Sequence, residues 1–130
     1  MDLHTHTIAS GHAYSTLKEN LEQARERGLL VMGISDHSCV PPAPAIPYYL
    51  RNFKVFTPYM LGIRLLKGVE ANIVDYQGNI DVEEQDLARL DYVIASLHQQ
   101  NLAPGSRLQN TQAICGAIRH PRVNIIGHPN

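Results

Sequence analysis

The chain opens with DLHTHT at residues 2–7, which contains the pair His4 and His6. If residues 1–5 form a strand, side chains two apart lie on the same face, about 6.6 Å from each other. Two imidazoles would then point to one place in space. If that pair binds a metal ion, the rest of the chain must fold so that further ligands reach the same place.

Candidate ligands recur at the ends of four later apolar runs. The runs at 30–34, 65–69, 92–95 and 123–126 are followed by Asp36-His37, Glu70, His98 and His128, respectively. Chance rarely ends every strand-like run with a ligand, so we predict a polynuclear metal site. Imidazole with carboxylate suits zinc, manganese or iron, and the near absence of thiols argues against a cysteine-type zinc site.

Other polar residues have alternative interpretations in this pattern. Asp36 and Asp2 could each orient an imidazole or ligate directly, and a solvated or capping carboxylate is the alternative for both. Arg107 is a candidate phosphate contact or else a surface arginine. His120 stands at a predicted helix end, which indicates a structural role. We take Glu70, His98 and Asp36 as candidate catalytic residues.

Composition limits the classes of partner. With 130 residues, 44% of them hydrophobic, the chain can form one domain with a core of its own. The net charge of −1 offers no basic surface for nucleic acid, and no apolar run or leader-like N-terminus indicates a membrane or secretion. Cys39 and Cys115 form no CxxC motif, so we expect reduced thiols in a cytoplasmic protein, although Cys39 could be a ligand.

Helix-like and strand-like segments alternate along the chain. We expect strands near 1–5, 29–34, 64–69, 91–97 and 123–127, and helices over 16–27, 48–61, 82–90 and 110–119. Thr16 with Glu19 predicts a capping box, 41–47 a proline-rich loop beside the site or a spacer, and 72–81 a small loop or hairpin. Right-handed crossovers would give a parallel sheet with every ligand at one face.

Five strand–helix units are only part of a closed barrel, which takes about 250 residues. The last unit ends directly after His128. We therefore expect a fragment or a split protein, which would pair with further copies of itself or with a complementing C-terminal chain.

The motifs at His4 to Thr7, Asp36-His37, Glu70, His98 and His128 resemble, in order, those of the PHP (polymerase and histidinol phosphatase) family. The loop with His12 resembles that of its small stand-alone phosphatases, the YcdX type. The resemblance implies that residues 1–130 are the N-terminal portion of a distorted (β/α)₇ barrel that holds three metals.

The resemblance also implies a ligand set. His4, His6 and Glu70 would hold one metal, Glu70 with His98 and His128 a second, and His12 with His37 a third. The family adds one Asp and one His near its C-terminus, and this sequence contains neither of them.

We expect a metal-dependent phosphoesterase that hydrolyses phosphorylated small molecules with a metal-bridging hydroxide. Up to three Zn²⁺ ions would be the cofactors, with Mn²⁺ or Fe²⁺ as alternatives. This chain alone could be inactive. The competing interpretations are an amidohydrolase-type hydrolase, which commonly has a bridging lysine where this chain has His98, and a non-catalytic, metal-stabilised PHP module.

Overall fold

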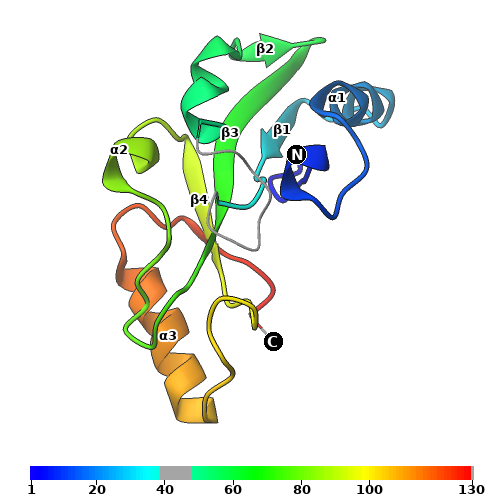
Figure 1. Ribbon diagram of the computed structural model, residues 1–130. Helices are drawn as coiled ribbons and strands as arrows, with labels where there is room; N and C mark the ends of the chain where they lie inside the picture. The colour runs from blue at the N-terminus through cyan, green and yellow to red at the C-terminus, as the bar shows by residue number, and fades with distance from the viewer. Residues whose placement is uncertain (39–47, 130) are drawn as a thin grey trace.

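The computed structural model describes residues 1–38 and 48–129 (Figure 1). The predicted proline-rich loop at 41–47 and Cys39 lie outside these residues. None of the helices within them is both long and apolar enough to cross a membrane. The elements in chain order are the 3₁₀ helix η1 (Ile8–Ser10), α1 (Leu17–Glu26), β1 (Val31–Ile34), the 3₁₀ helix η2 (Leu50–Val55), β2 (Tyr59–Met60), β3 (Ile63–Asn72), α2 (Glu84–Leu87), β4 (Tyr92–Ser96), α3 (Arg107–Arg119) and β5 (Ile125–Ile126).

The fold is built on a sheet in which the strands follow the order β1-β3-β4-β5, all parallel. The long strand β3 is its centre: residues 64–67 pair with β1, and residues 68–72 pair with β4. Figure 1 shows β3 running the length of the sheet, with α1 and α3 near opposite ends. The predicted α/β class with a parallel sheet is therefore confirmed.

The N-terminal segment runs beside β1 but is not the regular strand predicted at 1–5. Only Asp2 forms a parallel bridge, to Met32. The reason is local, since the N–H of His4 donates to Oδ1 of Asp2, 3.1 Å away, rather than to the neighbouring strand. Thr5 still contacts the chain beyond β1 through the N–H of Ser35, 2.9 Å from its carbonyl oxygen.

The predicted helix at 48–61 is wrong. The structure has the short 3₁₀ helix η2 followed by β2, which pairs antiparallel with the start of β3. Leu61 and Gly62 connect the two strands with φ of 51° and 81°, the left-handed values that a two-residue hairpin requires. Pro58 has no N–H for a continuing helix, so the apolar residues after it enter a strand instead.

The first predicted helix is correct, and the last begins earlier than predicted. In α1, Thr16 accepts from the N–H of Glu19, and the Glu19 carboxylate accepts from Thr16 in return, so the capping box is confirmed. Helix α3 has the same device at Ser106 and Gln109, several residues before the expected start at 110. The longer helix takes in Arg107, which precedes the helix predicted at 110–119.

Tyr92 joins the N-terminal segment to the sheet. Its hydroxyl donates to the carbonyl oxygens of Leu3, at 2.7 Å, and Ile34, at 3.2 Å. The ring lies against two glycines, and a Cβ on Gly68 would be only 2.2 Å from the ring carbon Cζ. A side chain in β4 thus fixes the backbone just before His4.

Candidate metal centre

All the predicted metal-binding residues meet at the carboxyl end of the sheet. They line one cavity of about 670 Å³, together with Ser10, Gly11, Asn72, Gln100 and Asn101. Strand β3 supplies Glu70, and the histidines come from the chain around it: His4 and His6 before η1, His12 after η1, His37 after β1, His98 after β4 and His128 after β5. The parallel order of the strands brings these positions together, as the sequence predicted.

The carboxylate of Glu70 is the centre of this arrangement. It is 1% exposed and has five imidazole nitrogens within 3.4 Å. On Oε2 the distances are 3.2 Å to His4, 3.1 Å to His6 and 3.4 Å to His37, and on Oε1 they are 3.4 Å to His98 and 2.9 Å to His128. Ser96 also donates to Oε1, at 2.6 Å. Each carboxylate oxygen therefore faces its own group of histidines.

This environment keeps the carboxylate charged. Burial alone would raise the pKa of Glu70, but the contacts with the ring nitrogens of His6, His98 and His128 and the hydrogen bond from Ser96 outweigh it and hold the pKa well below its usual value. The pKa of His37 is lowered to about 4, chiefly by burial and also by the neighbouring histidines, against the opposing effect of Glu70. At neutral pH, His37 therefore has a free nitrogen lone pair.

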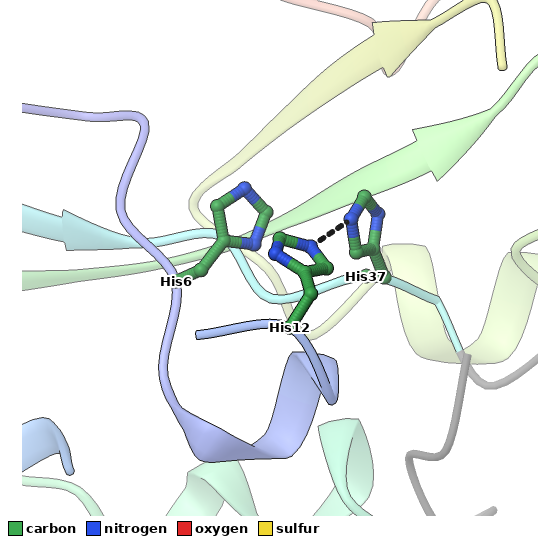
Figure 2. Close-up of side chains that lie close together, drawn as sticks. All are labelled: His6, His12 and His37. Atoms are coloured by element: carbon green, nitrogen blue, oxygen red, sulfur yellow. Dashed lines mark hydrogen bonds between the residues drawn. The ribbon is translucent and has the colours of Figure 1, made fainter. Parts of the chain in front are cut away.

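Among residues 1–38 and 48–129, three groups of side chains each bring their ligand atoms within 4.8 Å of one another. They are His6 with His12 and His37, His4 with Glu70 and His128, and His37 with Glu70 and His98. Figure 2 shows the first group, in which Nε2 of His12 faces Nε2 of His37 at 2.8 Å. Converging nitrogens around a charged carboxylate are the donor set of zinc, manganese or iron. The residues therefore fit a polynuclear metal centre.

Asp36 lies behind the histidines and not in the cavity. It is fully buried and accepts from the N–H and the hydroxyl of Thr7, at 2.6 and 2.8 Å, from the hydroxyl of Tyr49, and from Ser10 at 2.6 Å. Ser10 Oγ is in turn 2.9 Å from Nδ1 of His6. These contacts favour the predicted orienting role for Asp36 over direct ligation.

The remaining predicted residues lie away from the cavity. Arg107 is exposed at the start of α3 and does not line the cavity, so its role as a phosphate contact stays a prediction. His120 caps the end of α3 and accepts the N–H of Arg122 at 3.2 Å, in keeping with a structural role. Asp2 accepts the N–H of His4 and so contacts the backbone of a ligand rather than its ring.

Sequence reasoning missed residues that contact the ligands directly or through one neighbour, among them Ser10, Asn72, Asp81 and Ser96. Period-two alternation could have identified Asn72, because it stands two residues after Glu70 on the same face of a strand. Ser96 stands two residues before His98 in the same way. Nothing in the sequence marks Asp81, since the loop that carries it has no regular period.

Comparison with known proteins matches this chain to one family and to several named relatives. A family model described as PHP domain matches residues 2–123. A probable phosphatase of Clostridium novyi is 48% identical over 130 residues, covering 99% of this chain and 53% of that protein. Probable phosphatases of Caldanaerobacter subterraneus and Acetivibrio thermocellus are 48% and 42% identical, each over 99% of this chain and over 51% and 54% of their own lengths. The chain thus spans about half the length of the curated relatives it matches.

Proposed function

Because the chain belongs to the PHP domain family, we propose that it forms part of a metal-dependent phosphoesterase that hydrolyses phosphomonoesters at a polynuclear centre. The observation that carries the proposal is the single buried carboxylate of Glu70 with five imidazole nitrogens within 3.4 Å. The relatives named probable phosphatases support the reaction class.

The ligand groups support more than one cation. His4 and His128 would hold one ion with Glu70, and His37 and His98 another with the same carboxylate. A carboxylate shared by two cations offsets their mutual repulsion, which a neutral ligand cannot do. A third ion would be held by His6 and His12, and His37 would complete either this group or the group of Glu70 and His98, because a neutral imidazole has one free lone pair. We propose zinc, with manganese or iron as alternatives, because the donors are nitrogen and oxygen.

The cavity itself indicates why metal would be needed. No lysine or arginine is among its lining residues in the described part of the chain, so a bound phosphate would meet no side-chain cation that is permanently charged. Divalent cations, when bound, would lower the pKa of a water molecule and stabilise negative charge on phosphate oxygens. Glu70 stays ionised to hold them, and Ser96 donates to Glu70 so that the carboxylate keeps its orientation.

The sheet order supports a barrel as the complete fold. The N-terminal segment, β1, β3, β4 and β5 are neighbours in the order in which they occur in the sequence. Barrels wind in this way, whereas doubly wound sheets reverse direction partway. We propose that this chain supplies about the first five units of a distorted (β/α)₇ barrel, and that a phosphorylated small molecule enters the cavity at its carboxyl end.

The experiment joins this chain to the second half of a relative. Residues 1–130 replace the matching part of the Clostridium novyi probable phosphatase, and the chimera is assayed with p-nitrophenyl phosphate and with an amide substrate in the presence of Zn²⁺ or Mn²⁺. We expect metal-dependent hydrolysis of the phosphate ester only, and at least a hundredfold loss in Glu70→Gln. A folded chimera that binds metal and hydrolyses the amide instead would overturn the proposal, as would one that binds no metal.

A further inference from the structure

Asn72 connects a cavity histidine with a carboxylate outside the cavity. It lies two residues after Glu70 in β3, is 3% exposed, and places Oδ1 2.6 Å from Nδ1 of His98. On its other side, Nδ2 donates to Oδ2 of Asp81 at 2.5 Å and to Oγ of Ser38 at 3.1 Å. Asp81 is not among the residues that line the cavity.

Asp81 fixes which way the Asn72 amide points. Its carboxylate receives three donors: the backbone N–H of Asn72 at 2.8 Å, the side-chain Nδ2 of Asn72 and the hydroxyl of Ser38. An ionised carboxylate can only accept hydrogen bonds. The NH₂ group of Asn72 must therefore face Asp81, and its carbonyl oxygen must face His98.

This orientation decides the tautomer of His98. A carbonyl oxygen only accepts, so Nδ1 of His98 carries the proton, and Nε2 presents its lone pair toward Oε1 of Glu70, 3.4 Å away. We propose that Asp81 is a positioning residue that acts through Asn72 to hold His98 in the tautomer that binds a metal ion. The metal-binding part of this inference rests on the proposed function, and the tautomer itself does not.

A separate series of hydrogen bonds on the other side of the site sets the tautomer of His6 in the same way. Ser10 donates to Asp36 at 2.6 Å, so its oxygen accepts from Nδ1 of His6 at 2.9 Å. His6 then presents Nε2 to Oε2 of Glu70. Each oxygen of the Glu70 carboxylate thus faces one histidine whose tautomer is fixed by a carboxylate outside the cavity.

Asp81→Asn tests the proposal with little change in shape. If the new side chain keeps its bond to the backbone N–H of Asn72, its NH₂ group meets the NH₂ group of Asn72. The Asn72 amide must then turn over, donate to Nδ1 of His98 and move the ring proton to Nε2. In the metal-free 130-residue chain, ¹⁵N NMR of the imidazoles should show Nδ1–H for His98 in the wild type and Nε2–H in the variant. The His98 signals are assigned by their loss in His98→Gln.

Zn²⁺ affinity gives a second readout. Changes to groups that orient a ligand commonly weaken metal binding about 10- to 100-fold, and we expect a loss of this size in Asp81→Asn. The matched control is Asp75→Asn, because Asp75 accepts from the N–H groups of Gln77 and Asn79 in the same loop region but contacts no histidine. The control should leave the His98 tautomer and the affinity unchanged.

The outcomes separate the positioning role of Asp81 from the proposed function. A wild-type His98 with its proton on Nε2 overturns the positioning role whether or not any variant folds. An unchanged tautomer in Asp81→Asn, or an equal change in Asp75→Asn, also overturns it. A wild-type chain that shows the predicted tautomer but binds no Zn²⁺ would instead contradict the proposed function.

Discussion

The hydroxyl of Ser96 donates a 2.6 Å hydrogen bond to Oε1 of Glu70, between two side chains that are 0% and 1% exposed. Strand pairing brings them together. In the register of β4 with β3, Ser96 is opposite Asn72, which lies two residues after Glu70 on the same face of β3. Gly127 leaves the room they need, since a Cβ there would lie 2.2 Å from Ser96 Oγ. The charge on Glu70 is therefore partly balanced by the protein itself.

Removing this donor should cost more than removing an ordinary buried hydroxyl. We expect Ser96→Ala to lower the free energy of unfolding of the metal-free chain by about 1.5–3 kcal/mol, the range for hydrogen bonds to charged groups. Urea unfolding measures the loss. The control is Ser35→Ala, also 0% exposed, whose hydroxyl makes two hydrogen bonds to uncharged groups, because it donates to the carbonyl of Thr5 and accepts the N–H of Thr5. A loss in Ser96→Ala no greater than half the loss in Ser35→Ala, which is the loss per hydrogen bond, would contradict the role assigned to the charge.

Histidines inside and outside the cavity should differ sharply in their effect on turnover. His4→Ala or His6→Ala, in the chimera described above, should reduce phosphatase turnover at least a hundredfold while the far-ultraviolet circular dichroism spectrum stays the same, because each removes a ligand. His120→Ala should keep nearly full turnover, since that ring accepts the N–H of Arg122 and does not line the cavity. Comparable losses at His4 and His120 would show that the division into metal-binding cavity histidines and a structural His120 is wrong.

Glu70→Gln should lose metal despite its nearly identical shape. A neutral amide cannot offset the repulsion between two cations, so we expect at least one fewer bound ion per chain by elemental analysis after dialysis. His98→Gln is a useful comparison, because it removes a ligand from one group only. If Glu70→Gln retained full metal content, Glu70 would not be a shared ligand.

The metal-free chain should show an unusually acidic histidine. Burial and the neighbouring rings lower the pKa of His37 to about 4, against about 6.5 for an unfolded chain. Protonation therefore favours the unfolded state, and the contribution of His37 to stability should fall as the pH drops from about 6.5 to about 4. An NMR titration of the ring C–H signals checks this value. A midpoint near 6.5 would contradict the burial argument.

Tyr92→Phe should loosen the N-terminal segment. The variant leaves the carbonyl oxygens of Leu3 and Ile34 without their hydroxyl donor, and we expect a loss of about 1–3 kcal/mol in the free energy of unfolding. Amide hydrogen exchange should become faster at Gly33, whose N–H donates to Asp2. Unchanged exchange there would mean that the phenol does not hold this segment.

The sequence predicted that the candidate ligands converge, because their positions follow from topology. His37, His98 and His128 each follow a strand, and parallel strands must bring their carboxyl ends to one side. Nothing more than the period of the apolar residues was needed for that step. One error of element type, the helix at 48–61, came from a segment where Pro58 and the turn at Leu61 outweighed a helix-like spacing of apolar residues.

The residues around the ligands could not be predicted in the same way. Asp81 reaches Asn72 across a loop, and Ser10 reaches Asp36 from a 3₁₀ helix, so both contacts depend on tertiary packing that has no period in the sequence. Arg107 is the opposite case, because the sequence suggested it for the site and the structure places it away from the cavity. Its charge made it a candidate, but the capping box at Ser106 extends α3 and places the arginine on an exposed turn.

The rings of His4 and His128 stack with their centres 5.9 Å apart, although almost the whole chain separates them in sequence. On a ribosome, the first of these residues emerges long before the second, and they become neighbours only after β5 has paired with β4. Contacts between such distant residues carry a high loop-closure entropy and form late in folding. Capture of a metal ion by this pair would therefore mark the completion of synthesis and folding of the segment between them rather than guide its early steps.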